Sequence, residues 1–214
     1  LKEDFAGFDA QLIIMDVVPW MLPYYEASGI QFEIEDNRDY MDYTFTPEQF
    51  LAGMDMQDDR YRYNYFKRRF AYETEEITPF HREEIREFME REWCGEKTCE
   101  VCHCGCLLRV IDNLVPVFDK IRINGILVRV EGKMAGLCIV SCRNGLGVYQ
   151  YKNAVNRIKG INEYLLRESF ERYLQSADTI NYTEDMGVEN LRYYKEHMAP
   201  AHTLLSKLTL TERG

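Results

Sequence analysis

Two adjacent carboxylates near the end of the chain, Glu184 and Asp185, are the first candidates for chemistry. A carboxylate could take a proton from an amine nucleophile or position it, because only a neutral amine attacks a carbonyl carbon. The pair follows a strand-forming segment at 179–183 and precedes Gly187 and a helical segment at 188–198. Carboxylates also stabilise the positive end of a helix dipole, so a role as helix caps is an equal alternative.

Other polar side chains accompany this pair. Tyr182 could protonate a leaving group, as could Tyr149 and Tyr151, and fifteen tyrosines in the chain leave that choice open. Arg192 and Lys195 follow at i, i+3 spacing, which places both cations on one helix face. The segment is therefore both a candidate site and an ordinary capped helix.

Five of the seven cysteines crowd one stretch of the chain, which also contains His103. Thiolates and imidazoles are the ligands that structural zinc prefers. Only one pair has the two-residue spacing of a zinc ribbon, so a thiol-rich loop and a redox-sensitive lid are the alternatives. Cys138 and Cys142 lie in an apolar segment and are expected in the core. The candidate zinc ligands are Cys94, Cys99, Cys102, Cys104 and Cys106.

The segment from Arg60 to Arg69 interleaves cations with aromatic residues. Such a mixture suits phosphate contact combined with base stacking. An amphipathic helix with buried rings and solvated cations is the alternative, and the net charge of −10 favours it. The same net charge argues against a general nucleic-acid binder.

Length and composition set the class of protein. A chain of 214 residues that is 46% apolar can bury a sizeable core in one or two domains. No apolar run approaches the roughly 20 residues of a transmembrane helix, and no signal peptide is visible, so a cytoplasmic location is expected. The chain begins without Met, which is compatible with a fragment of a longer protein, and nothing in it indicates an oligomeric state.

Hydrophobic periodicity and turn residues predict the elements that position these residues. Asn144-Gly145 and Glu131-Gly132 indicate hairpin turns, so three antiparallel strands precede a helical crossover. The predicted class is α/β (α+β): a mixed sheet with an antiparallel meander, flanked by helices. Strands are expected at 11–18, within 31–45 (a hairpin or two strands), and at 73–77, 125–131, 134–141, 146–152, 179–183 and 202–210. Helices are expected at 19–27, from 47, at 59–72, 78–93, 107–121, 162–174 and 188–198.

This order of elements resembles the GNAT acyltransferase fold. More narrowly, it resembles the C-terminal domain of phosphatidylglycerol lysyltransferases and their soluble bacterial relatives, which carry two GNAT-like halves. The chain departs from the family signature at Tyr182 and Thr183, where the family has Arg and Glu, and at His197 and Met198, where it has Ser and Tyr. The matching residues are Lys152, Gly160, Asn181, Glu184, Asp185, Gly187, Leu191, Arg192, Lys195 and Pro200.

The resemblance implies two parts of the chain and a donor site. Residues 1–45 would be the tail of an N-terminal GNAT-like half, and residues 46–214 the C-terminal GNAT-like domain. The acyl donor would enter between strands 146–152 and 179–184, with its phosphates at the next helix N-terminus. An ordinary glycine-marked helix start is the alternative for that last region. The residues that would bind the donor are Lys152, Arg157, Lys159, Gly160, Asn181, Arg192 and Lys195.

The resemblance also implies the reaction. An acyl or aminoacyl group would pass from acyl-CoA or aminoacyl-tRNA to an amine or hydroxyl on a small molecule, lipid or peptide. A tRNA donor would require a contiguous basic face that includes Arg60 and Arg69. The alternative function is a non-catalytic binding or regulatory module, and a donor cleft filled by side chains would favour it.

Overall fold

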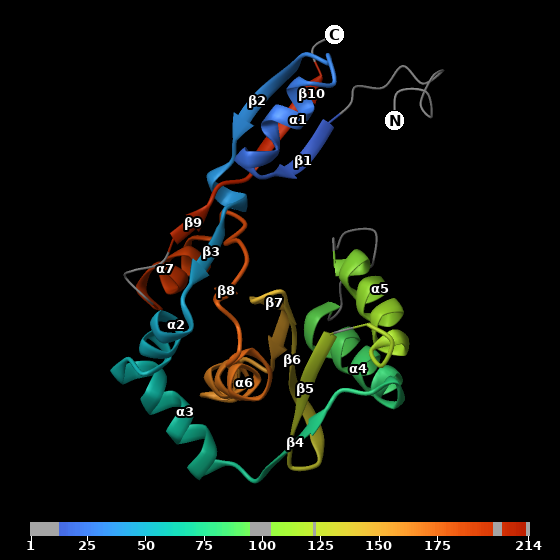
Figure 1. Cartoon of the computed structure of the whole chain (residues 1–214). Helices are drawn as coiled ribbons and strands as arrows, with labels where there is room; N and C mark the ends of the chain where they lie inside the picture. The colour runs from blue at the N-terminus through green and yellow to red at the C-terminus, as the bar shows by residue number, and fades with distance from the viewer. Residues whose placement is uncertain (1–12, 95–103, 122, 199–202, 213–214) are drawn as a thin grey trace.

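Seven strands form the main sheet of this protein, seen here in a computed structural model that describes residues 13–94, 104–121, 123–198 and 203–212. The strand order is β4-β5-β6-β7-β8-β3-β9, and β7 and β8 are the parallel pair (Figure 1). The strands are β3 (Asp42–Phe45), β4 (Tyr72–Glu76), β5 (Ile123–Val130), β6 (Lys133–Arg143), β7 (Leu146–Ala154), β8 (Thr179–Asn181) and β9 (Thr203–Leu205).

Two tight turns produce the antiparallel meander of β5, β6 and β7, as predicted. Glu131-Gly132 and Asn144-Gly145 all have positive φ, which matches the right-handed twist of paired strands. The chain then crosses over the sheet through helix α6 (Ile161–Ser169), which continues as a π-helical turn to Leu174, and enters β8 parallel to β7. Parallel neighbours cannot be joined by a tight turn, and this is why a helix lies between β7 and β8 in the sequence.

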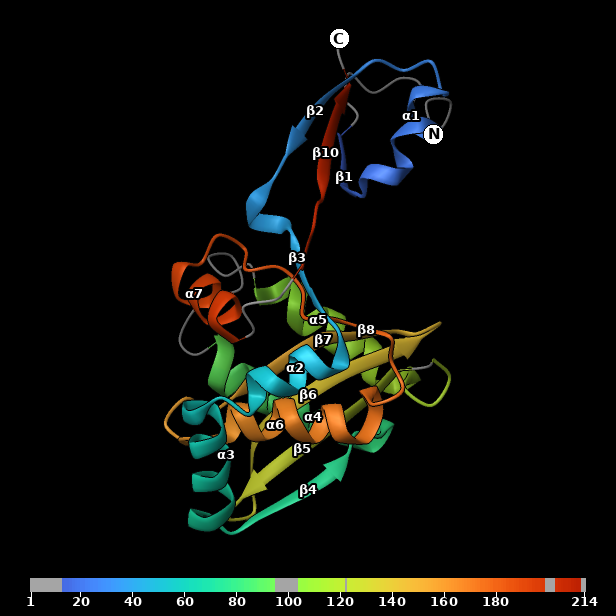
Figure 2. The ribbon, with the colours of Figure 1, turned by 60° about the vertical axis from the view of Figure 1, so that its left-hand side comes forward.

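Helices cover both faces of the main sheet (Figures 1 and 2). A capping box at Thr46 and Gln49 begins the first helix of one layer, as the sequence predicts. Phe50, Phe66, Phe88, Leu137 and Ile139 are fully buried members of the shared core. One layer contains α2 (Pro47–Met54), α3 (Gln57–Arg69) and α6, the opposite layer contains α4 (Arg82–Met89) and α5 (Cys104–Leu114), and α7 (Glu189–Met198) packs beside α2.

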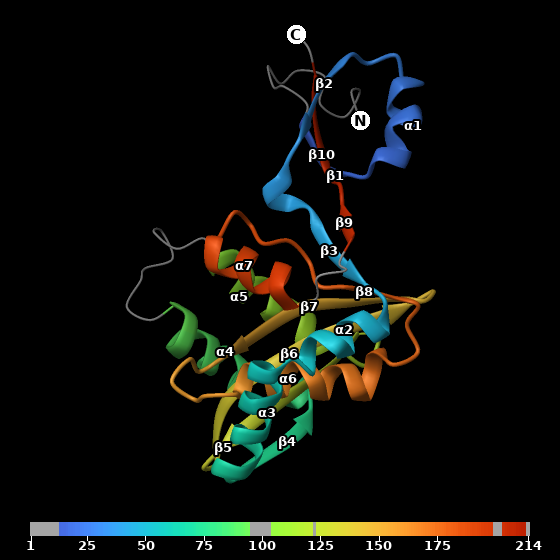
Figure 3. The same cartoon turned by 90° about the vertical axis from the view of Figure 1, so that its left-hand side faces the viewer.

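A separate three-stranded sheet joins the two ends of the described chain (Figures 1 and 3). Its middle strand, β10 (Leu208–Glu212), pairs with β1 (Ile13–Val17) on one side and β2 (Phe32–Asp36) on the other. Helix α1 (Leu22–Glu26) packs on it, around a small core of Val17, Leu208 and Leu210.

Of the two alternatives for residues 31–45, the structure has two strands and not a hairpin, since β2 and β3 belong to different sheets. The single strand expected at 202–210 is instead divided between β9 and β10. Division of the chain at residue 45 stays a prediction, although β3 lies inside the main sheet. None of the described helices has the length and apolar character to cross a membrane.

Candidate functional site

The parallel strands β7 and β8 separate soon after they meet. Only three residue pairs join them, from Leu146–Thr179 to Val148–Asn181, whereas β7 continues for six more residues. Beyond that point β8 turns away, and a bulge at Gln150 interrupts the pairing of β7 with β6, because Val140 faces Tyr149 while Ile139 faces Tyr151. Bulges often lie beside active sites, where they redirect backbone groups.

Aromatic rings fill the base of this separation. Tyr149 and Tyr182 are both buried, with their ring centroids 5.3 Å apart, and Phe50 packs against both. The Tyr149 hydroxyl donates to the Leu166 carbonyl at 2.8 Å. Burial raises the pKa of Tyr182, so its phenol keeps its proton at neutral pH. The role of Tyr182 as a proton donor stays a prediction.

An open cavity of about 480 Å³ lies where β7 ends and α6 begins. Lys152 donates from Nζ to Asn162 Oδ1 at 3.0 Å, and burial lowers the pKa of this lysine. Arg157 is mostly exposed and lies 3.5 Å from the Glu92 carboxylate. The cavity therefore brings together two of the predicted donor-binding cations. Its lining is Glu92, Lys152, Asn153, Ala154, Asn156, Arg157 and Asn162.

Gly160 allows two helices to touch beside this cavity. Its φ is +89°, and a Cβ at this position would lie 2.1 Å from the Arg62 carbonyl oxygen of α3. Glycine is therefore required for the approach of α3 to the start of α6. A direct contribution of Gly160 to donor binding stays a prediction.

The solvent-facing side of α3 lies next to the contact between Gly160 and Arg62. Lys159 extends over the rings of Tyr61 and Tyr65, with Nζ 4.8 and 5.2 Å from the ring centroids. Arg60 and Arg69 are exposed and form no ion pair with another described residue. Their spacing of nine places them at opposite borders of the exposed arc, with both tyrosines between them. The face is thus basic and aromatic.

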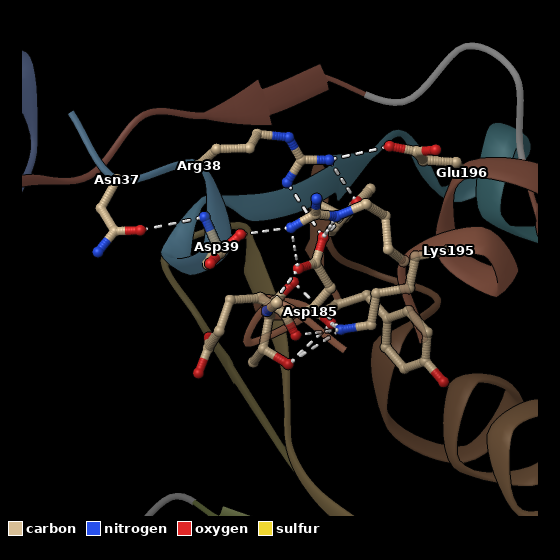
Figure 4. Close-up of polar contacts among 12 residues, drawn as sticks. Asn37, Arg38, Asp39, Asp185, Lys195 and Glu196 are labelled. Atoms are coloured by element: carbon tan, nitrogen blue, oxygen red, sulfur yellow. Dashed lines mark hydrogen bonds and ion pairs between the residues drawn. The ribbon is translucent and has the colours of Figure 1, made fainter. Parts of the chain in front are cut away.

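The predicted carboxylate Asp185 is fully buried in a network of donors (Figure 4). Arg192 donates to it through Nε at 3.0 Å and Nη2 at 2.9 Å, the Tyr43 hydroxyl donates at 2.7 Å and Arg38 Nη1 at 3.1 Å. The Gly187 N–H donates at 2.9 Å. Burial alone would raise the pKa of Asp185, but the bonds from Arg192, Tyr43 and Gly187 outweigh it and hold that pKa well below its usual range.

This environment bears on the predicted role of Asp185. A carboxylate that is saturated with donors, and that holds a strongly lowered pKa, is a weak proton acceptor. The geometry supports an anchoring role, in which Asp185 joins the segment after β8 to α7 and to the residues before β3. The predicted role as a base stays untested, and Glu184 is the more available carboxylate, partly exposed and 3.7 Å from Lys207 Nζ.

Lys195 is buried beneath the same turn. Its ammonium donates to the carbonyl oxygens of Tyr182 at 2.5 Å, Glu184 at 2.8 Å and Thr183 at 3.2 Å. Asn181 accepts from the Thr183 N–H at 2.7 Å and donates to Asp42 at 2.8 Å. Neither Lys195, Asn181 nor Arg192 is among the residues that line the cavity at the end of β7.

Sequence reasoning missed several members of this network. Arg38 donates to Asp185, Tyr43 and Glu196, and Asp39 accepts from Arg192 at 2.5 Å. Arg38 and Tyr43 precede Asp185 by more than 140 residues. No local pattern connects them, although a buried acid implies that basic partners exist somewhere in the chain.

The cysteine cluster lies only partly within the described residues. Cys99 and Cys102 lie in the stretch that the structure does not describe, while Cys94 ends one helical segment and Cys104 and Cys106 begin α5. Among the residues the structure describes, no group of three or more His, Cys, Asp or Glu could hold a metal ion. The zinc site stays a prediction.

Several solved structures share this architecture, among them the following three. A conserved protein of unknown function from Bacteroides thetaiotaomicron is 25% identical, with a TM-score of 0.82 over 100% of this chain and 73% of that one. L-PGS from Bacillus licheniformis is 15% identical, with a TM-score of 0.68 over 99% and 70%. A tandem GNAT protein from the clavulanic acid biosynthesis pathway is 11% identical, with a TM-score of 0.54 over 94% and 62%.

The predicted GNAT-like fold is thereby confirmed. No curated protein sequence matches this chain significantly. The sequence profile of the family "Phosphatidylglycerol lysyltransferase, C-terminal" matches residues 1–206, and family and fold together support acyl or aminoacyl transfer as the class of reaction. The chain belongs to the phosphatidylglycerol lysyltransferase C-terminal family.

Proposed function

We propose that this protein transfers an aminoacyl group from aminoacyl-tRNA to a hydroxyl or amine acceptor, with a phospholipid such as phosphatidylglycerol as the first candidate. The observation that carries the proposal is the cavity at the end of β7, which lies next to the exposed face of α3. The cavity offers Lys152 and Arg157 to phosphate, and α3 offers Tyr61 and Tyr65 to unpaired bases.

The separated strands supply a place for the reacting ester. Backbone groups of β7 beyond Val148 have β6 as their only strand partner among the described residues. An N–H group at the Gln150 bulge could stabilise the oxyanion that forms when the acceptor attacks the ester carbonyl. The acceptor loses a proton, the bond to the ribose oxygen breaks, and that oxygen takes up a proton. Glu184 is the proposed proton acceptor and Tyr182 the proposed donor.

Acyl-CoA is the competing donor, because the same Lys152 and Arg157 would also suit a pyrophosphate. The aromatic face of α3 favours tRNA, since a coenzyme pyrophosphate would not need Tyr61, Tyr65 and Lys159, which lie outside the cavity. Because the overall charge is −10, affinity for tRNA would depend on this local face together with the cations of the cavity.

A binding experiment separates the two donors. Fluorescence anisotropy with bulk tRNA is measured between 50 and 200 mM salt for the wild type, Arg60→Gln and Lys159→Gln. The slope of log K against log salt should fall by about one for each removed cation. Arg86→Gln is the matched control, because this exposed arginine lies on α4 across the sheet. Equal slopes in all variants, with thermal stabilisation by acetyl-CoA or longer acyl-CoAs, would refute the tRNA donor.

A non-catalytic module is the second candidate, and the rings of Tyr149 and Tyr182 in the strand gap favour it. The two candidates differ in turnover. Incubation with a pool of radiolabelled aminoacyl-tRNAs and phosphatidylglycerol vesicles should yield labelled lipid if the protein is a transferase. Retained tRNA binding without labelled product, with amine acceptors also tested, would favour the module.

A further inference from the structure

The turn that follows β8 has an unusual backbone. Thr183 has φ +57°, Met186 +53° and Gly187 +71°, so two residues with side chains occupy the left-handed region within five positions. A β-branched residue such as Thr183 strongly disfavours this conformation. Strained residues of this kind persist only where their surroundings hold them, and they gather at functional sites.

Lys195 is the group that holds this backbone in place. Three consecutive carbonyl oxygens, from Tyr182 to Glu184, converge on its ammonium, and the side chain is 3% exposed (Figure 4). Consecutive carbonyls point in different directions in an extended strand, so their convergence requires the turn that the positive φ of Thr183 creates. Lys195 Nζ also lies 4.6 Å from the centroid of the Tyr182 ring.

The segment whose carbonyls contact Lys195, residues 182–184, contributes to the base of the gap between β7 and β8. The Tyr182 ring packs against Tyr149 and Phe50, at the level where β7 and β8 cease to pair. A shift in the Tyr182 backbone would therefore move a ring that borders the proposed ester position. The lysine itself is 13 residues away on α7 and does not line the cavity at the end of β7.

We propose that Lys195 is a positioning residue for the transfer reaction: it acts through the carbonyls of Tyr182, Thr183 and Glu184 to set where Tyr182 and the end of β8 stand in the gap. The inference rests on the proposed function. It assigns Lys195 no contact with the donor, in contrast to the donor-binding role expected from the family signature. Binding of the donor should thus be separable from turnover.

The test compares Lys195→Met and Lys195→Gln with the wild type. Methionine has similar length without charge or donors, and glutamine retains two N–H donors if methionine prevents folding. Lys133→Met is the control, since Lys133 is exposed at the start of β6, next to the β5–β6 turn. Hydrogen exchange followed by mass spectrometry should show faster exchange in peptides that span 180–188, with unchanged protection of β6 and α6. Transfer kinetics then use aminoacyl-tRNA and phosphatidylglycerol vesicles.

A positioning role predicts a kcat at least about tenfold lower, with the donor KM changed by less than about threefold. A role confined to stability would lower the amount of folded protein and leave both constants of the folded fraction unchanged, and that result would overturn the inference. Unchanged exchange at 180–188, or a change in KM alone, would also overturn it. A wild type that transfers nothing would instead refute the proposed function, and the inference with it.

Discussion

Replacement of Asp185 by asparagine should strongly destabilise the protein. The new side chain would keep an acceptor for the Gly187 N–H, but it would turn an amide N–H₂ group toward Arg38, Arg192 and Tyr43, which all donate to this site. Breaking a buried ion pair costs about 3–5 kcal/mol. Because Arg38 and Arg192 are about one-third exposed and can recover hydration, we expect about 3 kcal/mol.

The assay is thermal or urea unfolding at pH 7. For a chain of 214 residues, unfolding entropy near 2 cal/mol/K per residue converts this loss into a Tm lower by about 7 °C. Asp39→Asn is the matched control, because Asp39 contacts the same Arg192 from an exposed position and should lose less than about 1 kcal/mol.

The pH dependence gives a second check on Asp185. Its pKa is lowered in the folded state, so its contribution is complete above the unfolded value of about 3.9 and declines as the pH falls toward the lower, folded value. The difference between wild type and Asp185→Asn should therefore narrow only below about pH 4. A loss below about 1 kcal/mol at pH 7, or equal effects of the Asp185 and Asp39 variants, would refute the anchoring role.

Two further predictions concern Gly160, at the start of α6, and Lys195, on α7. Gly160→Ala should lower the free energy of unfolding, measured by urea titration, by at least about 2 kcal/mol. The new Cβ would clash with the Arg62 carbonyl, and alanine would also have to adopt a positive φ. An unchanged free energy of unfolding would contradict the tight approach of α3 and α6. Burial lowers the pKa of Lys195 to about 8, below its unfolded value of about 10.4, so the contribution of this lysine to stability should rise by about 2–3 kcal/mol between these pH values. In urea unfolding, the stability of the wild type relative to Lys195→Met should therefore increase over this range, and a constant difference would contradict the shift.

Local sequence signals predicted most of the elements of the fold. The glycine-containing turns, the capping box at Thr46 and the helical crossover each depend on interactions within a few residues, so their patterns are visible in the sequence. The placement of β3 between β8 and β9, and of β10 between β1 and β2, depends on pairing across more than 130 residues. Alternation of apolar residues does not specify such partners.

For the candidate site, the sequence indicated which residues to consider but not the contacts that they make. The family resemblance directed attention to Lys152 and Arg157, which line one cavity, and to Asp185, Arg192 and Lys195. The sequence carried no sign that Lys195 would face backbone carbonyls. Its burial depends on how α7 packs beneath the turn, and that is a property of the tertiary structure.

The central position of β10 has a consequence for synthesis of the chain on the ribosome. Among the described residues, β1 and β2 have no strand partner except β10, so these early segments leave the ribosome about 170 to 200 residues before their partner does. Their edges and the apolar side chains of Ile14 and Phe32 stay unpaired during that interval. Closure of long loops is slow, and exposed strand edges favour aggregation. The small sheet can therefore form only after β10 has left the ribosome, long after β1 and β2 have done so.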